Sequence, residues 1–433
     1  MAETDPDFQI NVDLHVQEIL LAASQHNIPR LHELIRTENP DSAENPVNVK
    51  DPETGSTPLH AAIAACEVDG DDDGDETNGA TDSADKQAER ERVIETARET
   101  VKFLLQEGAI WNDLDTNNET PGCIARRLGL TELYELLVDA GVRAEMLFNR
   151  LEGYEQLADD DEDGEEGGNG EEKEEKGMKE NGHAEQSEAA PPTTTKDKDA
   201  STTTQTAETK EPAVTNGEYL QSNLTFQTDR ILDADRNGVM MSWESEIMSR
   251  TAAKLLPEKG LRVLNIGHGM GIIDGFFQSH SPSEHHIVEA HPAVLEQMER
   301  TGWRDKPGVT IHAGKWQDVL PKLLEENRTF DAIYYDTFAE SYADFRQYMS
   351  EYVIGLLDPS RGQWSFFNGM GADRQISYDV YQKVVELDAF EAGYDITWET
   401  IPVPKMDDRD WEGVRRKYWV VDSYRLPICR FMD

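Results

Sequence analysis

The stretch RVLNIGHGMG, residues 262–271, places a short apolar run directly before a glycine-rich turn. A run of this kind predicts a buried β-strand, and glycines let the following backbone turn sharply and approach a ligand closely. A strand that leads through such a turn into a helix is typical of nucleotide-binding α/β units. The stretch therefore predicts the first strand of a parallel sheet, with a ligand site at the end of that strand.

Four more short apolar runs follow this strand, and segments with helical periodicity separate them. The runs cover residues 285–290, 309–314, 330–336 and 362–369. This alternation predicts an α/β domain with a doubly wound, Rossmann-like parallel sheet. Two further apolar runs, 396–404 and 417–431, predict strands that close the sheet at the end of the chain.

The second predicted strand ends in an acid, Glu289, which lies 22 residues after Gly267. At this position a carboxylate can accept both ribose hydroxyls of an adenosine ligand. The turn has the pattern GxGxG at Gly267, Gly269 and Gly271, whereas GxGxxG is the pattern that seats a pyrophosphate. The spacing therefore favours S-adenosylmethionine as the cofactor, and a nicotinamide-dependent dehydrogenase is the less favoured alternative.

The N-terminal part, residues 10–150, contains short blocks of helical periodicity. The string GSTPLHAAI at 55–63 resembles the TPLH-x-A turn of an ankyrin repeat, and NETPGCIARR at 118–127 is a degenerate copy. These strings predict a small all-α ankyrin repeat domain that binds protein or covers an enzyme domain. His60 of the first turn is expected to hydrogen-bond neighbouring backbone rather than to bind a metal or take part in catalysis.

Acidic residues are concentrated in two stretches. The chain has 41 Lys plus Arg against 87 Asp plus Glu, a formal net charge of −46. Residues 155–218 carry 20 acids and 6 bases, which predicts a disordered acidic linker, and residues 67–92 carry 11 acids and 3 bases, which predicts a loop inserted between two helices. We therefore expect domains at 10–150 and 219–433, and the acidity argues against nucleic acids and anionic membranes as partners.

Cysteine usage and the N-terminus indicate a soluble intracellular protein. Cys66, Cys123 and Cys429 are widely separated, so neither a disulfide framework nor a metal site is expected. The opening MAETDPDFQI has no basic segment followed by an apolar core, and nowhere do about 18 apolar residues run uninterrupted.

Five motifs in the C-terminal half together resemble guanidinoacetate methyltransferase: VMMSWESEIM (239–248), LNIGHGMGI (264–272), HHIVEAHPAVLEQM (285–298), HAGKWQDV (312–319) and FDAIYYDTFAES (330–341). With ankyrin repeats in front of it, the chain resembles a narrower family, the fungal protein arginine N5-methyltransferases. The resemblance implies a class I methyltransferase domain that uses S-adenosylmethionine to methylate the internal (δ) nitrogen of an arginine in a protein. It also implies a basic large-subunit ribosomal protein as substrate, and a location in cytoplasm and nucleus.

The resemblance further implies which residues form the site. Glu244 of the WE pair and Asp336 of YYDT would grip the guanidino group. Cofactor contacts are implied for Phe226, Met240, Met248, Gly267, His268, Gly269, Met270, Gly271, Ile272, Glu289, Ala290, His291, Lys315, Trp316 and Asp336. From the residues alone, alternatives stay open: Asp336 as a turn cap, Glu244 as an exposed helix acid, and Trp316 and the methionines as ordinary core.

Two carboxylates suit this chemistry because S-adenosylmethionine and arginine are both cations. Glu244 and Asp336 would offset their repulsion, orient the planar guanidinium and accept a proton late in the reaction. The sequence departs from the small-molecule pattern at 271–273 and 339–352, which puts the substrate rather than the cofactor in question. Two alternatives remain: a small-molecule guanidino methyltransferase with an ankyrin appendage, and an ankyrin interaction protein whose methyltransferase fold only senses its ligand.

Overall fold

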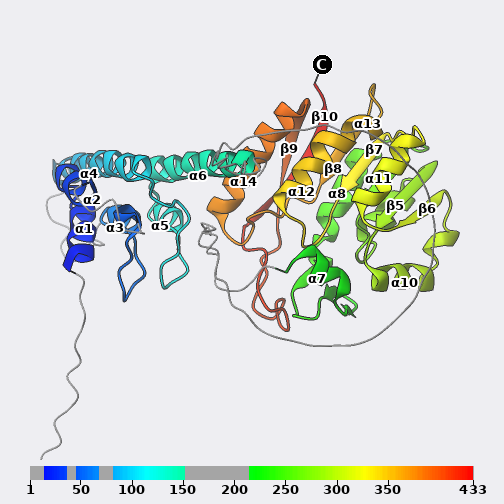
Figure 1. Cartoon of the computed structure of the whole chain (residues 1–433), viewed down its shortest axis with the longest axis horizontal. Coiled ribbons are helices and arrows are strands. Elements are labelled where there is room, and N and C mark those ends of the chain that lie inside the picture. Colours follow the sequence, from blue (N-terminus) through cyan, green and yellow to red (C-terminus); the bar gives the residue numbers. More distant parts are fainter. Residues whose placement is uncertain (1–13, 37–44, 68–80, 152–213, 433) are drawn as a thin grey trace, which may run out of the picture.

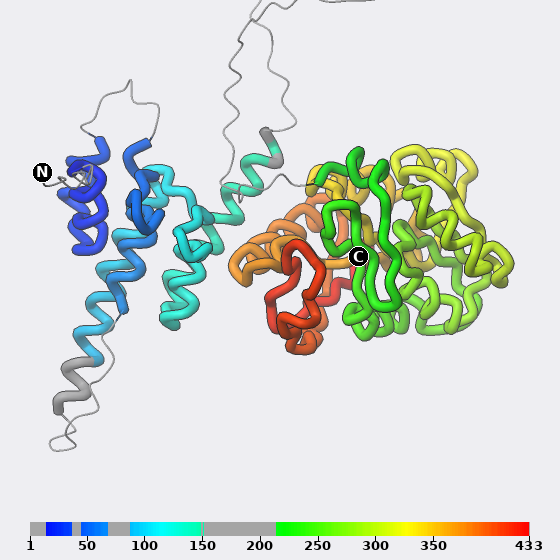
Figure 2. Tube along the Cα trace, turned by 90° about the horizontal axis from the view of Figure 1, so that it is seen from below, coloured from blue at the N-terminus to red at the C-terminus, as the bar shows by residue number. Residues whose placement is uncertain are grey.

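The computed structural model describes residues 14–36, 45–67, 81–151 and 214–432. They form an N-terminal helical module, residues 14–151, and a C-terminal domain, residues 214–432 (Figure 1; Figure 2). The predicted linker at 155–218 lies outside the described residues up to 213. Its last residues are helical, because α7 (Asn216–Gln221) spans the predicted boundary at 219. The structured part of the C-terminal domain therefore begins a few residues earlier than predicted.

The C-terminal domain is built on a seven-stranded sheet with the order β6-β5-β4-β7-β8-β10-β9. Its strands are β4 (Arg262–Ile266), β5 (Glu284–Glu289), β6 (Val309–Ala313), β7 (Ala332–Tyr335), β8 (Gln363–Phe366), β9 (Tyr394–Pro402) and β10 (Ser423–Phe431). Strands β4 to β8 run parallel, and β10 pairs antiparallel with both β8 and β9. Counted from β4, the order is 3-2-1-4-5-7-6, that of the class I methyltransferase fold. The predicted fold class of this domain is confirmed, although the last strand begins at Ser423 rather than at 417.

Helices cover both faces of this sheet (Figure 1). They are α8 (Ser245–Leu255), α9 (Ile272–Ser279), α10 (Pro292–Arg300), α11 (Trp316–Glu325), α12 (Tyr342–Gln347), α13 (Val353–Leu356) and α14 (Gln375–Glu391). Val263 and Tyr334 pack in the cluster that contains α8 and α9, whereas Leu264, Ile333 and Tyr335 pack in the cluster that contains α11 and α13. Successive strand residues thus face opposite layers, which is why these strands are apolar along their whole length.

Two smaller elements complete the C-terminal domain. A three-stranded sheet combines β1 (Thr225–Phe226), β2 (Arg230–Leu232) and β3 (Gly238–Met241). Directly after β3, the 3-10 turn Ser242–Glu244 leads into α8. These segments bring the predicted WE pair to the end of the central sheet.

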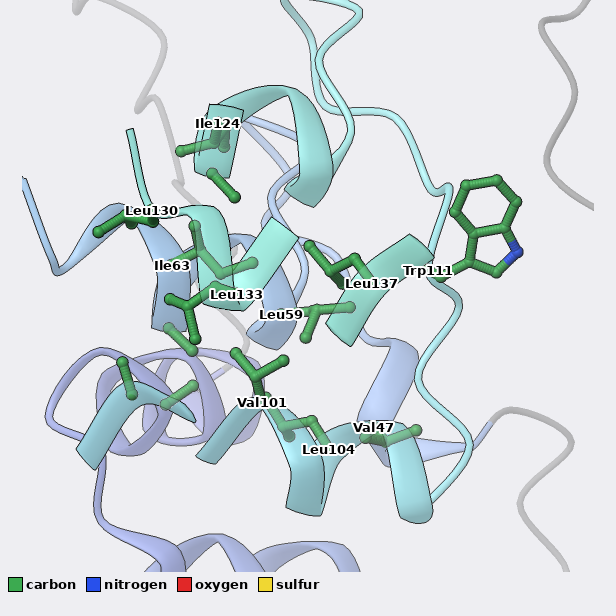
Figure 3. Packing of buried hydrophobic residues seen from close by; sticks show 14 of the residues in the cluster. Val47, Leu59, Ile63, Val101, Leu104, Trp111, Ile124, Leu130, Leu133 and Leu137 are labelled. Atoms are coloured by element: carbon green, nitrogen blue, oxygen red, sulfur yellow. The ribbon is translucent and has the colours of Figure 1, made fainter. Parts of the chain in front are cut away.

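The N-terminal helical module consists of paired helices around one apolar core (Figure 3). The helices are α1 (Leu14–Ser24), α2 (Ile28–Arg36), α3 (Pro58–Ala64), α4 (Thr81–Gln106), α5 (Pro121–Arg127) and α6 (Thr131–Leu151). Thr57 and Thr120 cap α3 and α5 in the same way, each followed by proline at the first helical position. His60 Nδ1 accepts from Thr57 N at 3.2 Å, and His60 Nε2 lies 3.1 Å from Glu119 O, so its predicted structural role is confirmed.

The predicted loop insertion at 67–92 is wrong in its second half, because α4 begins at Thr81. Acids and bases alternate at helical spacing here, with Arg92 beside Glu89 and Arg98 beside Glu95. Such i,i+3 pairs support a helix even where apolar residues are few. Residues 68–80 of the predicted loop lie outside the described residues.

The helical module packs directly against the C-terminal domain. Helix α6 lies beside α14 (Figure 1), and Ile376, Val380 and Val384 of α14 belong to the same apolar cluster as the core of the module. Tyr134 Oη donates to Asp379 Oδ2 at 2.6 Å across this contact. The two parts therefore share a continuous core.

Within the described ranges no helix is long and apolar enough to cross a bilayer. The same ranges contain no group of three or more His, Cys, Asp or Glu placed to hold a metal ion. The cysteines are free thiols.

Candidate active site

The glycine-rich turn after β4 lies where the central strands end. Gly267 and Gly269 have φ values of +93° and +54°, in the left-handed region that favours glycine. A Cβ on Gly267 would lie 1.8 Å from the carbonyl oxygen of Asp336, because β4 and β7 end side by side. The turn therefore depends on glycine to bring the backbone of β4 against the end of β7.

This turn forms one wall of a small cavity of about 60 Å³. Eight predicted cofactor residues meet around it: Met240, Gly267, Gly269, Glu289, Ala290, Lys315, Trp316 and Asp336. The sequence did not point to Tyr219, Leu220, Phe338 and Glu340, which also line the cavity. Residues from six different segments thus converge near the carboxyl ends of the parallel strands, where ligands bind in open α/β sheets.

Glu289 anchors the turn through its carboxylate. It accepts a hydrogen bond from His268 N at 2.8 Å and another from His291 N at 2.7 Å. These bonds fix the carboxylate at the cavity wall, in the position from which it is predicted to bind ribose. That role remains a prediction.

Seven predicted cofactor residues line neither this cavity nor the larger one described below: Phe226, Met248, His268, Met270, Gly271, Ile272 and His291. Phe226 packs on the cluster around Val294 and Trp303, and Met248 is fully buried in the core. The imidazole of His291 caps α10 by accepting from Ala293 N. These residues do not line the cavities of the free protein, and their predicted contacts with the cofactor stay a prediction.

A buried carboxylate, Asp274, ties the turn to the elements behind it. Its oxygens lie 2.6 Å from His268 Nδ1 and 2.8 Å from His285 Nε2, and one also accepts from Asn265 Nδ2 at 2.8 Å. Burial opposes ionisation of Asp274, but the hydrogen bonds from the two histidines outweigh it and lower its pKa to about 2. The only sign of this arrangement in the sequence is an acid three residues after Gly271.

A large cavity of about 610 Å³, partly open to solvent, shares Asp336 with the small one and is also lined by Glu244. Glu244 is 3% exposed, and its Oε1 accepts from Tyr418 Oη at 2.5 Å and from Met241 N at 3.3 Å. Asp336 Oδ2 is buried and has no hydrogen-bond partner among the described residues. Glu244 is therefore not an exposed helix acid, and Oδ2 of Asp336 caps no turn.

Both carboxyl groups are held in surroundings that disfavour negative charge. Burial, and then the nearby Asp336, raise the pKa of Glu244 to about 8. Burial, and then Asp274, raise the pKa of Asp336 to about 7. Two such groups in one cavity form a site that a cation stabilises, because the cation favours their ionised forms.

Glu340 joins the two cavities, since it lines both. Its carboxylate accepts from Trp316 Nε1 at 2.9 Å, from Thr337 Oγ1 at 2.7 Å and from the Tyr335 hydroxyl. Trp316 is 2% exposed, so it packs as core and also reaches the cavity wall. Glu340 lies in the segment where the sequence departs from the small-molecule pattern, which was the available signal for it.

Helix α7 covers the small cavity. Tyr219 packs its ring 4.8 Å from that of His291 and 4.9 Å from that of Phe338, measured between ring centroids. Pockets for whole ligands usually exceed about 300 Å³, so a cofactor needs more room than this cavity provides in the free protein. Apart from this cover, the glycine cradle, the unpartnered Asp336 oxygen and the Glu289 carboxylate fit an adenosine cofactor with a positive centre.

Comparisons with known proteins found several similar proteins. The model of the guanidinoacetate N-methyltransferase family matches residues 216–362. "Protein arginine N-methyltransferase 2" of Aspergillus fumigatus is 63% identical over 433 residues, 100% of both chains, and its namesake in Neurospora crassa is 45% identical over 446 residues, 96% of each. Among solved structures, M. jannaschii TYW2 in complex with AdoMet is 13% identical, with a TM-score of 0.30 over 48% of this chain and 84% of that chain. A putative SAM-dependent methyltransferase from Streptococcus mutans is 12% identical, with a TM-score of 0.33 over 51% and 56%.

Proposed function

Because this chain belongs to the family of fungal proteins named protein arginine N-methyltransferase 2, we propose that it methylates the internal δ nitrogen (N5) of an arginine side chain in a protein. The chain is a methyltransferase with S-adenosylmethionine as cofactor. When bound, this cofactor supplies an electrophilic methyl group on a sulfonium ion. Met240, Glu289, Lys315 and Trp316 are the residues that would hold it beside the turn at Gly267.

The observation that carries the proposal is the pair Glu244 and Asp336. Both line the large cavity, and Asp336 also lines the small one, which supports a cofactor in the small cavity and a substrate in the large one. Guanidinium is planar, permanently charged and presents several N–H donors, which two carboxylates can hold in one orientation. Orientation decides which nitrogen faces the methyl carbon.

The same two carboxyls serve as proton acceptors. A free guanidinium is too weak an acid to give a proton to either carboxylate. As the bond to the methyl carbon forms, the attacking nitrogen loses its resonance with the other two guanidine nitrogens. Its proton then becomes acidic enough to transfer. Burial raises the pKa values of both groups in the free protein, and bound cations favour their ionised forms, so Glu244 and Asp336 are available as acceptors when the nitrogen releases its proton. Binding and charge compensation thus come first, and proton transfer follows.

A second candidate substrate is a small guanidino compound. The match of residues 216–362 to the guanidinoacetate N-methyltransferase family favours it, because Glu244 and Asp336 both lie inside the matched range. The reacting centre of both substrates is the alkyl-bearing nitrogen of a guanidine. The large volume beyond the two carboxylates favours the protein substrate.

The remaining features of the proposal concern partners and place. The two Thr-Pro helix starts of the module, at Thr57 and Thr120, support ankyrin repeats, and we assign the module to that class. The overall acidity supports a basic protein as substrate, and a large-subunit ribosomal protein is our choice. We place the enzyme in cytoplasm and nucleus, without direct contact to nucleic acid or membrane.

The test is methylation by the purified full chain of a mixture of large-subunit ribosomal proteins, with S-adenosylmethionine as donor. Tandem mass spectrometry should locate one added methyl on the δ nitrogen of an arginine, and the Asp336→Asn variant should lose this product. Methyl groups on terminal arginine nitrogens would contradict the proposed regiochemistry. Free guanidinoacetate is assayed in parallel, and its preferential methylation would favour the second candidate.

A further inference from the structure

The large cavity has walls from two different parts of the chain. Its C-terminal-domain wall includes the two carboxylates Glu244 and Asp336. Its other wall belongs to the helical module and consists of Trp111, Asn112, Leu114, Thr120 and Glu145. A single cleft therefore runs from the proposed reaction centre to the loop between α4 and α5 and to the C-terminal half of α6.

Close backbone packing fixes this second wall in place. A Cβ added to Gly122 of α5 would lie 1.9 Å from Ile376 Cδ1, and one added to Gly141 of α6 would lie 2.7 Å from Val380 Cγ2. The module thus presses its helix backbones against α14, and a slide between the two would create clashes or a cavity. Tyr381 Oη donates to Glu145 Oε2 at 3.1 Å across the same contact.

Trp111 connects the packing of α6 to the loop between α4 and α5. It stands at one edge of the apolar cluster of the module, 6% exposed (Figure 3), and its ring lies about 3.0 Å from the Cβ position of Gly141. The cleft-lining residues Asn112 and Leu114 lie one and three residues after it in the sequence. The position of the loop is therefore tied to the packing of α6 on α14.

The two walls differ in their similarity to the small-molecule family. Residues 216–362 match the guanidinoacetate N-methyltransferase model and contain both carboxylates. The helical module lies outside that range, as do cleft residues from Phe366 to Tyr418. The guanidine-binding end is thus the part shared with a small-molecule enzyme, and the far wall is additional.

We propose that the module wall of this cleft binds the polypeptide on either side of the target arginine, so that the helical module is part of the substrate site for a basic protein. This assignment rests on the proposed function. Glu145 is the charged side chain that the module contributes to the cleft, whereas the opposite side carries Arg374, Arg415 and Arg416 together with the acids Asp373 and Glu340. Basic substrate residues are therefore expected on the module side, where a negative charge attracts them and no lining residue is cationic.

The test compares two peptides that contain the arginine found by mass spectrometry, one of about three residues and one of about fifteen, since only the longer chain can reach the far wall. Asn112→Lys and Leu114→Lys add a positive charge to the wall and should raise KM for the long peptide about tenfold at unchanged kcat. For the short peptide both variants should match the unmodified enzyme. Thr116→Lys is the matched control, because Thr116 is exposed on the same loop and does not line the cleft.

A second measurement does not depend on a substitution. Hydrogen exchange of amides 112–120 in the unmodified enzyme should slow when the long peptide binds and should stay unchanged with the short one. If the unmodified enzyme methylates neither peptide nor the intact protein, the proposed function fails and the role of the wall with it. A different result overturns only the role of the wall. In that case the unmodified enzyme methylates both peptides, the lysine variants have the same KM for the long peptide as the unmodified enzyme, and hydrogen exchange of amides 112–120 does not slow.

Discussion

Glu244 and Asp336 show how two single residues prepare a site for a cation. Tyr418 and the amide of Met241 hold Glu244 in place, whereas Oδ2 of Asp336 has no partner among the described residues. A buried unpaired carboxylate destabilises a protein, and such strain usually marks a place where a ligand binds. The free enzyme is therefore expected to have a lower free energy of unfolding when these two groups are ionised than when they are protonated.

This expectation gives a pH-dependent prediction for Glu244. Its pKa is raised from 4.5 to about 8, so between these values the folded protein binds more protons than the unfolded chain, and the free energy of unfolding falls as pH rises. Glu244→Gln removes this dependence. In the absence of cofactor, the variant and the native protein should have similar Tm values near pH 5, and the variant should melt several degrees higher near pH 9.

The control for this prediction is Glu246→Gln, which removes an exposed acid that pairs with Arg250 one turn away. Surface pairs of this kind contribute little, so its Tm should stay close to that of the native protein at both pH values. If the Tm of the Glu244→Gln variant near pH 9 is equal to or lower than that of the native protein, burial does not penalise the charged carboxylate.

At the scale of elements, the sequence predicts those helices, strands and turns that are determined by the local pattern of residues. The five parallel strands appear as apolar runs because both sheet faces are buried, and the glycine turn appears because only glycine tolerates its dihedral angles and the nearby Asp336 carbonyl. The cover by α7 and the Glu340 network depend on partners that the fold alone brings together. In the N-terminal half of α4, the charge-rich composition predicts a loop, but the structure has a helix whose acids and bases form i,i+3 pairs.

The element most open to test is the link between the glycine turn, β5 and α9 through Asp274. Asp274→Asn weakens the hydrogen bonds to both histidines in a fully buried position, where breaking a paired group typically costs about 3–5 kcal/mol. We expect a lower Tm and weaker binding of S-adenosylhomocysteine in calorimetry. Because a general loss of stability would affect all amides, hydrogen exchange should show faster opening of residues 267–271 than of the helical module.

Asp318→Asn provides the comparison, since Asp318 is exposed in the first turn of α11. A surface substitution of this kind should change stability by less than about 0.5 kcal/mol. Unchanged cofactor affinity in the Asp274→Asn variant would mean that the link holds the scaffold together without positioning the turn.

At the scale of the whole molecule, charge and packing separate into different parts of the chain. The shared core of the helical module and α14 was not predictable, because Ile376, Val380 and Val384 look like any buried helix face until their partner is known. The charge was visible from the start. Of the net −46, a large part lies in residues 67–92 and 155–218, whereas the C-terminal domain combines a mild acidic excess with a cleft for a cationic side chain.

The electrostatic field of these acidic residues affects how fast a basic substrate associates with the enzyme, not the chemical step. For a basic protein substrate, kcat/KM should fall about tenfold between low salt and about 0.5 M salt while kcat stays constant, because salt shortens the range of the attraction. Replacing the acids in residues 159–175 by their amides should flatten this dependence and leave the rate for a three-residue arginine peptide unchanged. If salt lowers kcat itself, or slows the short peptide equally, the acidic stretch does not recruit the substrate, and the specificity for a basic protein rests on the cleft between the module and α14.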